Sequence, residues 1–262
     1  MIDISIIIVT YNNEETIKKC LDTVLGDNRY LEVIVIDNLS NDLTVELVKG
    51  YGSKVKLIKN NGNLGFAKAN NMAVNVAKGD YLIFLNPDTE IIEKNTFERL
   101  IKVLEENQQY GLIGPKLMLK NGYVQKSVRR LPTVWGAMNE YIFGVKGAFD
   151  FYIPDCKKLC EVESVVGACI VMKRKVFNEI GGFNEKYFLY FEDLELCNSV
   201  RKQGLKVGYA ANIKIEHILG QSGKNKNVTK LNLESSRKYF GSLRFLLIQY
   251  IGRLGNMLRS SR

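Results

Sequence analysis

Apolar runs of strand length alternate with helix-like segments over residues 3–104, and this alternation restricts the possible folds more than any other feature. Residues 3–10, 31–36, 54–59 and 81–85 are predicted strands. Helical spacing of apolar residues follows in residues 14–25, in a segment capped by Asn41 or Asp42 that reaches Val48, and in residues 66–77 and 96–104. Strands and helices that alternate at this interval predict an α/β fold, with a mostly parallel sheet and helices on both faces.

Polar residues directly follow three of the predicted strands: Thr10-Tyr11-Asn12, Asp37-Asn38 and Asn86-Pro87-Asp88. The carboxyl ends of parallel strands meet at one edge of the sheet, where open α/β sheets bind ligands. The carboxylate of Asp88, held by a stiff proline turn, suits a hard divalent cation of the kind that accompanies phosphates. Asp37 suits a ribose or a base as hydrogen-bond acceptor, but aspartate is also common in ordinary turns.

The first turn, Val9 to Asn13, contains no glycine. A dinucleotide fingerprint requires G-x-G-x-x-G at this place, and a phosphate loop requires G-x-x-x-x-G-K-[ST]. We therefore expect the sheet to bind a mononucleotide through side chains and a metal ion.

The regular alternation weakens after Gly114. Residues 116–163 are predicted to form a hairpin and an irregular insertion. A strand at 163–172 and a helix at 174–180 follow, and then the aromatic loop of residues 187–191 leads into a helix at 192–203 and a strand at 206–209.

Two further sets of candidate functional residues lie in the part of the chain after Gly114. Glu192 and Asp193 begin the predicted helix, where the helix dipole stabilises a carboxylate, and the aromatic loop before them suits the apolar face of a sugar. Either acid could be a general base, or simply a helix cap. His217, the single histidine of the chain, follows the last predicted core strand and is a candidate metal ligand or an ordinary packing residue.

The five cysteines are odd in number and scattered, which favours reduced thiols in a cytoplasmic protein. Cys156 and Cys160 are close in sequence, but one histidine gives a zinc site little support. We expect neither a secretory signal at the N-terminus nor a spanning helix.

Positive charge gathers at the C-terminus. From Lys224 onward there are nine Lys or Arg residues and one acidic residue, Glu234. Apolar residues recur there at roughly helical spacing, which predicts a basic amphipathic helix at an anionic membrane surface. A packing helix or an oligomer interface fits the pattern equally well. Nucleic acid is not an expected partner, because the body of the chain has no recognition module.

Taken together, the ordered motifs of residues 3–222 resemble inverting glycosyltransferases of family 2, most closely their rhamnosyltransferase-like branch. The matching segments are Val9-Thr10-Tyr11-Asn12, residues 35–42, residues 63–71, Leu85-Asn86-Pro87-Asp88-Thr89, Gly167-Ala168-Cys169, Gly181-Gly182-Phe183-Asn184-Glu185, Tyr190-Phe191-Glu192-Asp193 and His217. The resemblance implies the GT-A fold, a Rossmann-like α/β architecture.

By this resemblance Asp193 is the catalytic base, and Asp88 and His217 hold Mg²⁺ or Mn²⁺. The residues that it places near the nucleotide sugar are Thr10, Tyr11, Asn12, Asp37, Asn63, Gly65, Phe66, Asn86, Asp88, Gly167 and Glu192. Asn86 replaces the first acid of the family's D-x-D motif. Ser199 stands where relatives often have arginine, and Asn184 where many have aspartate, so the functions of those two residues do not carry over.

The expected activity is metal-dependent, inverting transfer of a sugar from a nucleotide-diphosphate donor to a saccharide or lipid-linked saccharide, in cell-surface polysaccharide synthesis. The resemblance implies dTDP-rhamnose as the donor; the alternatives are a UDP-sugar or, on a related fold, a sugar nucleotidyltransferase. The expected domains are residues 1–222, with a nucleotide-binding half at 1–115 and an acceptor half at 116–222, and a tail at 223–262. We expect a cytoplasmic protein that is peripheral at the inner face of the membrane, and homo-oligomers are compatible with the sequence.

Overall fold

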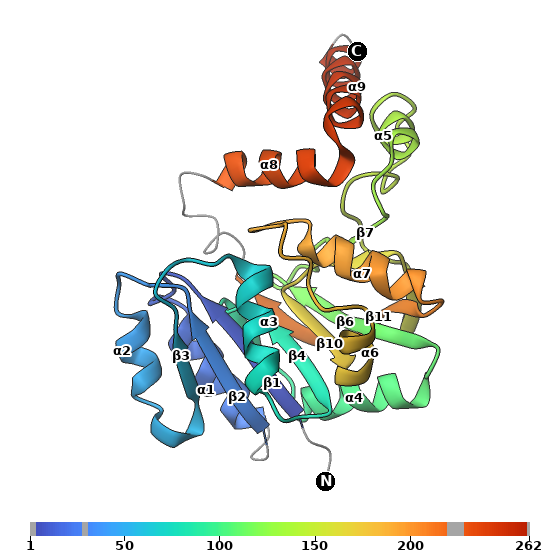
Figure 1. Ribbon diagram of the computed structural model, residues 1–262. Helices are drawn as coiled ribbons and strands as arrows, with labels where there is room; N and C mark the ends of the chain where they lie inside the picture. Colours follow the sequence, from blue (N-terminus) through green and yellow to red (C-terminus); the bar gives the residue numbers. More distant parts are fainter. Residues whose placement is uncertain (1–3, 28–30, 219–227, 261–262) are drawn as a thin grey trace.

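The computed structural model describes residues 4–27, 31–218 and 228–260. Its centre is a mixed β-sheet covered by helices on both faces, with three further helices gathered at one side (Figure 1). The strands are β1 (Ile4–Thr10), β2 (Leu31–Asp37), β3 (Lys56–Lys59), β4 (Tyr81–Leu85), β5 (Thr89–Ile91), β6 (Tyr110–Met118), β7 (Val128–Arg129), β8 (Leu159–Val162), β9 (Ser164–Val165), β10 (Cys169–Lys173) and β11 (Lys206–His217).

The other regular elements are helices. They are α1 (Ile17–Asp27), α2 (Thr44–Lys49), the short 3-10 helix η1 (Gly52–Lys54), α3 (Phe66–Val76), α4 (Thr96–Glu106), α5 (Val134–Tyr141), α6 (Arg174–Glu179), α7 (Glu192–Lys202), α8 (Val228–Phe240) and α9 (Ser242–Ser260).

The main sheet has the order β3-β2-β1-β4-β10-β6-β11-β5, with β8 paired to β11. Its first four strands are parallel, as predicted, and β10 is antiparallel to both of its neighbours. The polar residues that follow β1, β2 and β4 therefore end up at one edge of the sheet, and the fold class read from the sequence is confirmed.

The alternation of side chains along β1 shows how both faces are covered. Ile6 and Ile8 pack in one apolar cluster with α1 and α4, whereas Ile7 and Val9 pack in a second cluster with α3 and α7. Successive residues of a strand point to opposite faces, so a strand buried on both sides is a nearly continuous apolar run. That requirement explains why β1 was recognisable from its sequence.

Asn71 of α3 holds together two motifs that lie far apart in sequence. Its side-chain oxygen accepts a hydrogen bond from the Phe183 peptide N–H at 3.0 Å, and its amide nitrogen donates to the Phe183 carbonyl oxygen at 2.9 Å. Gly182 has a φ of 74°, and a Cβ there would lie 2.8 Å from the Asn71 oxygen. The Gly181-Gly182-Phe183 turn is therefore fitted to Asn71, and it directs the following loop toward the edge of the sheet.

The second half of the chain differs from the prediction at several points. The strand expected over 163–172 is divided into β9 and β10 by a turn, and the strand expected at 206–209 extends through His217. The helix α5 and the strands β5 and β6 were not predicted. The tail forms two helices, α8 and α9, that meet at Gly241 with a φ of 75°. The predicted boundary between residues 222 and 223 lies outside the described residues.

The expectation of reduced thiols was wrong for one pair. Cys156 and Cys160 form a disulfide, while Cys20, Cys169 and Cys197 are free and buried.

None of the helices in the described ranges is long and apolar enough to cross a lipid bilayer.

Candidate active site

A cavity of about 1580 Å³ opens at the sheet edge where β1 and β4 end. Its walls come from those strand ends, the loop before α7, the segment 124–129 and the helices α8 and α9. The cavity brings together most of the predicted site residues: Thr10, Tyr11, Asn12, Asn63, Gly65, Phe66, Asn86, Gly167, Glu192, Asp193 and His217. Asp37 and Asp88 are buried just behind its lining, with exposed fractions of 2% and 1%.

Asp37 organises the turn behind the cavity wall. One of its carboxylate oxygens accepts a hydrogen bond from the Thr10 hydroxyl at 3.0 Å, and the other accepts from the Ser40 peptide N–H at 2.9 Å. These contacts fix the ends of β1 and β2 relative to each other. Its neighbour Asn38, one of the polar residues predicted at this edge of the sheet, lines the cavity and donates to the Gly65 carbonyl oxygen at 3.1 Å.

Strand pairing brings Asp88 and His217 together across 129 positions of sequence. β5 pairs antiparallel with β11 so that Thr89 lies opposite His217, and the Ile218 peptide N–H donates to the Asp88 carbonyl oxygen at 2.8 Å. As a result, Nε2 of His217 lies 3.3 Å from Oδ1 of Asp88. His217 is the last residue of β11, whereas the sequence placed it just beyond the end of the strand.

Gln125 fixes the orientation of the His217 ring. The side-chain oxygen of Gln125 lies 2.8 Å from Nδ1 of His217, and an amide oxygen can only accept, so Nδ1 carries the proton. In the neutral ring, Nε2 then presents its lone pair beside the Asp88 carboxylate. Orientation of a ligating histidine through its second nitrogen is a general feature of metal sites.

An imidazole nitrogen and a carboxylate oxygen side by side fit a divalent cation. Within the described residues, no three or more His, Cys, Asp or Glu side chains are grouped closely enough to hold a metal ion between them. The protein would therefore contribute few ligands and leave the others to water and phosphate, which is how Mg²⁺ is bound at nucleotide sites. The residues present thus fit Mg²⁺ or Mn²⁺ together with a diphosphate.

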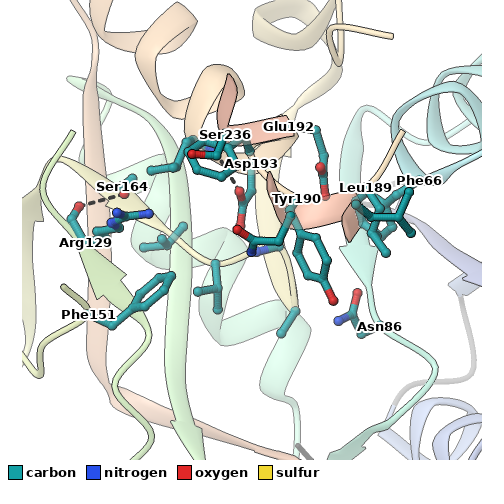
Figure 2. Close-up of a pocket in the computed structure, with 18 of the residues that line it drawn as sticks. Phe66, Asn86, Arg129, Phe151, Ser164, Leu189, Tyr190, Glu192, Asp193 and Ser236 are labelled. Atoms are coloured by element: carbon teal, nitrogen blue, oxygen red, sulfur yellow. Dashed lines mark hydrogen bonds between the residues drawn. The ribbon is translucent and has the colours of Figure 1, made fainter. Parts of the chain in front are cut away.

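Asp193 lies in the first turn of α7, and the backbone holds its carboxylate. The Gly167 peptide N–H donates to Oδ2 at 2.9 Å, and the Leu194 peptide N–H donates to Oδ1 at 2.8 Å. Figure 2 shows the carboxylate of Asp193 between Arg129 on one side and Tyr190 on the other. Gly167, predicted as a donor-binding residue, therefore has a direct role in positioning Asp193.

The chain enters α7 through two strained residues. Tyr190 and Phe191 both have a φ of 69°, a left-handed conformation that is unfavourable for residues other than glycine. The sharp turn directs the first-turn carboxylates of α7 into the cavity. Gly65 supports the same loop: its φ is 80°, and a Cβ there would lie 2.4 Å from the Phe188 carbonyl oxygen.

Burial changes the ionisation of the two adjacent acids. Burial raises the pKa of Asp193 against the effect of the hydrogen bonds from Gly167 and Leu194 and the charge of Arg129. Burial raises the pKa of Glu192 well above its usual value, and the neighbouring charge of Asp193 adds to the increase. The two carboxyls titrate as a pair, so the last proton leaves at a higher pH than from an ordinary acid.

Glu192→Gln is expected to stabilise the protein at pH 8 and to leave its stability unchanged at pH 4. The folded-state pKa of Glu192 is raised, so wild type loses free energy of unfolding as the pH rises through that pKa, whereas glutamine does not ionise. We expect the Tm at pH 8 to increase by about 2–4 °C for each kcal/mol by which the substitution raises the free energy of unfolding. Thermal melts at both pH values measure the effect, with the half-buried Glu195→Gln as control. A lower Tm at pH 8 would contradict it.

The sequence did not predict the roles of Gln125 and Arg129, which both line the cavity. Arg129 and Arg130 are adjacent in the chain, and nothing in the sequence indicated that Arg130 is exposed while Arg129 enters the cavity. Gln125 lies in a segment expected to be irregular. Its contact with His217 depends on the pairing of β6 with β11, which no local pattern reveals.

Two family models match the sequence of the chain. The model described as glycosyl transferase family 2 matches residues 5–181, and a model for the N-terminal domain of galactosyltransferase matches residues 148–220. The low-salt glycan biosynthesis hexosyltransferase Agl10 of Haloferax volcanii is 26% identical over 242 residues, covering 91% of this chain and 72% of its own. An N-acetylglucosaminyl-diphospho-decaprenol L-rhamnosyltransferase of Mycobacterium tuberculosis is 26% identical over 234 residues, covering 81% and 75%.

Solved structures support the fold. The mannosyltransferase PcManGT of Pyrobaculum calidifontis, in complex with GDP-Man and Mn²⁺, superposes with a TM-score of 0.64 at 17% identity, over 91% of this chain and 63% of that one. The chain spans between 17% and 98% of the length of curated relatives that it matches. With the family model covering more than half of the sequence, the chain belongs to glycosyltransferase family 2, an inverting family with the GT-A fold, and it is a nucleotide-sugar glycosyltransferase.

Proposed function

We propose that the protein is a metal-dependent inverting transferase that moves rhamnose from dTDP-rhamnose to a saccharide acceptor, in the synthesis of a cell-surface polysaccharide. The observation that carries the proposal is a single cavity with the Asp193 carboxylate in its wall and the Asp88–His217 pair at its edge. The choice of rhamnose is supported by the name of the mycobacterial relative.

In this proposal Asp193 is the base. Its carboxylate takes the proton of the acceptor hydroxyl as that oxygen attacks the anomeric carbon from the face opposite the diphosphate. The new carbon–oxygen bond forms while the bond to the diphosphate breaks, and the electron pair leaves with the diphosphate, so configuration inverts. The raised pKa of Asp193 makes it a stronger base than an ordinary carboxylate. No side chain is required as a nucleophile.

The donor would lie along the strand ends. We assign the nucleoside to Thr10, Tyr11, Asn12 and the turn held by Asp37, and the donor sugar to the wall made by Asn63, Gly65, Phe66, Gly167 and Glu192. Asp88 and His217 would hold Mg²⁺ or Mn²⁺, with Asn86 beside the diphosphate. A divalent ion in that position neutralises charge that builds up on the leaving diphosphate.

We also propose a division of labour along the chain. Residues 1–115 would bind the nucleotide and residues 116–222 the acceptor, and the tail of residues 223–262 would close the cavity. This division is supported by the lining of the cavity, to which α8 contributes Leu231, Asn232 and Ser236. Ser235 of α8 also donates to the Leu189 carbonyl oxygen at 2.7 Å, so the tail contacts the loop that carries Asp193.

The proposal predicts metal-dependent binding of dTDP. Calorimetry with dTDP, UDP and their sugars should give tight binding with Mn²⁺ and at least about tenfold weaker binding with EDTA, because the ion contributes to the diphosphate site. Preference for UDP would replace rhamnose by a UDP-sugar as the proposed donor. Preference for a nucleoside triphosphate would favour a nucleotidyltransferase, and no binding of any nucleotide would overturn the proposal.

We also propose that the protein is peripheral at the cytoplasmic face of a membrane; the arrangement of α9 supports the contact with a membrane. α9 packs against α5 through Ile248 and Ile251, and the two helices project from the sheet domain (Figure 1). The side of α9 away from α5 is apolar and exposed: Leu243, Leu246, Leu247, Tyr250, Met257 and Leu258. Trp135 on α5 is also 70% exposed, and tryptophan favours the membrane interface.

Replacing Leu246 and Tyr250 with serine together is expected to abolish co-flotation with liposomes that contain anionic lipid. Each large apolar side chain contributes about 1.5–3 kcal/mol on burial, so removing two should weaken binding at least about a hundredfold. A double change of the exposed Lys175 and Glu179 on α6 to serine is the control. Equal flotation of all variants contradicts membrane binding, and a shift in oligomeric state would instead identify an interface between copies.

A further inference from the structure

Arg129 occupies a prepared position that the proposed reaction does not use. It ends the short strand β7, and its carbonyl oxygen accepts a hydrogen bond from the Ser164 hydroxyl at 2.6 Å (Figure 2). Its Nε donates to the Phe149 carbonyl oxygen at 2.7 Å. One side of the guanidinium is thereby fixed, and the side chain lines the cavity.

Aromatic rings surround the same guanidinium. Its central carbon lies 4.8 Å from the ring centre of Phe149, 5.4 Å from that of Phe151 and 5.9 Å from that of Phe191. Rings around a cation hold it by cation–π attraction and also exclude water. The orientation of the planar group is therefore set before any ligand arrives, which lowers the entropy lost on binding.

The two terminal amino groups of Arg129 remain available. In the part of the chain that the structure describes, no side chain forms an ion pair with Arg129, and its one side-chain hydrogen bond uses Nε. The carboxylates of Asp150 and Asp193 act on its charge only from a distance, and Asp150 accepts a hydrogen bond from the Tyr141 hydroxyl at 2.8 Å. A largely buried cation without a direct ion-pair partner is costly, so the site is suited to an anion from outside the protein.

Position distinguishes this anion from the diphosphate of the donor. Figure 2 shows Arg129 and Asn86 on opposite sides of Asp193, and Asn86 is next to the proposed metal site. Lys126 and Arg253 line the cavity as well. An acceptor whose hydroxyl reaches Asp193 from the side opposite the donor would therefore bring its remaining part toward Arg129.

We propose that Arg129 anchors an acceptor subsite and binds a phosphate or diphosphate carried by the acceptor. This inference rests on the proposed transferase function and adds the chemical class of the acceptor. The planar fork of arginine matches phosphate oxygens with two parallel N–H bonds, which lysine cannot reproduce. The Phe149–Phe151–Phe191 surroundings strengthen those bonds by keeping water away.

The test uses geranyl diphosphate as the acceptor probe and geraniol as its uncharged counterpart. Calorimetry is performed on protein saturated with dTDP and Mn²⁺, so that the donor site is occupied. The variants are Arg129→Gln and Arg129→Lys, and the exposed neighbour Arg130→Gln is the matched control. We expect Arg129→Gln to weaken geranyl diphosphate binding by about 10–100-fold, because a charge-assisted hydrogen bond contributes about 1.5–3 kcal/mol. Arg129→Lys should retain part of the affinity.

The controls and the contrary outcomes are as follows. Arg130→Gln should bind geranyl diphosphate within twofold of wild type, and no variant should change the affinity for dTDP. Unchanged binding in Arg129→Gln, or no binding of geranyl diphosphate by a wild type that binds dTDP, overturns the inference. Loss of dTDP affinity in Arg129→Gln would assign the arginine to the donor and also overturn it. Failure of wild type to bind dTDP or UDP would instead overturn the proposed function, and this inference with it.

Discussion

Replacing Asp193 with asparagine is expected to lower kcat by about 10²–10⁴, the usual contribution of a general base. Asparagine is nearly isosteric, and its amide oxygen can keep one of the two backbone hydrogen bonds that now come from Gly167 and Leu194. The fold and the donor site should therefore survive, while the proposed general base is lost. Release of dTDP from the proposed donor, dTDP-rhamnose, in the presence of acceptor measures the rate.

Two controls separate loss of the base from general damage. Glu195→Gln changes another acid on the same helix. The carboxylate of Glu195 forms only a long ion pair, 4.0 Å from Nζ of Lys202, so this variant should keep near wild-type kcat. The pH profile is the second control: because burial raises the pKa of Asp193, wild-type kcat should fall on the acid side at a higher pH than an ordinary carboxyl would give. Wild-type turnover by a folded Asp193→Asn protein would refute the assignment.

The sheet was predictable to the extent that its strands are buried on both faces. β1, β2 and β4 are nearly continuous apolar runs, because Ile6 and Ile7 face different helices and neither can be polar. The short parallel β3 is only partly buried, and it was predicted as one of the strands that alternate with helices. The helices α1, α3 and α4 were predicted from the helical spacing of their apolar residues. The predicted starts of α1 and β3 lie a few residues before the observed ones. Element boundaries are hard to predict, because several neighbouring residues can serve as the helix cap or the turn.

The second half was less predictable because its strands depend on partners far away in sequence. β6 runs parallel to β11, nearly a hundred residues later, and β10 lies between β4 and β6 in the opposite direction. Glycines inside β6, including Gly111 and Gly114, hid the strand from a propensity reading. They are needed there because a Cβ at Gly111 would lie 2.8 Å from Val200 of α7.

The candidate site shows the same division. Asp88 and Asp193 were identified by their position, one after a strand and one at a helix start, and the structure brings both to one cavity, with Asp193 in its lining and Asp88 directly behind His217. Gln125 and Arg129 could not be identified in this way. The role of each depends on what surrounds it, a histidine ring for Gln125 and three phenylalanine rings for Arg129, and those neighbours come from separate segments.

The second large effect is expected from Asp88→Asn, which should remove most of the metal dependence of nucleotide binding and lower kcat by about 10²–10⁴. A divalent ion on a diphosphate stabilises the transition state by several kcal/mol, and each 1.36 kcal/mol is a factor of ten in rate. Asparagine keeps the size of the side chain and can still bond to His217, but it lacks the negative charge that balances the cation. The free energy of unfolding should therefore change little.

A thermodynamic cycle makes this prediction specific. The affinity for dTDP is measured with Mn²⁺ and with EDTA in wild type, in Asp88→Asn and in Asp80→Asn, an exposed aspartate just before β4 begins, at the opposite end of that strand. Wild type and Asp80→Asn should gain at least about tenfold from Mn²⁺, whereas Asp88→Asn should gain almost nothing, because the carboxylate and the ion act through one interaction. An equal gain in all three proteins would mean that the ion binds elsewhere, and Asp88 would then be a buried partner of His217 without a metal role.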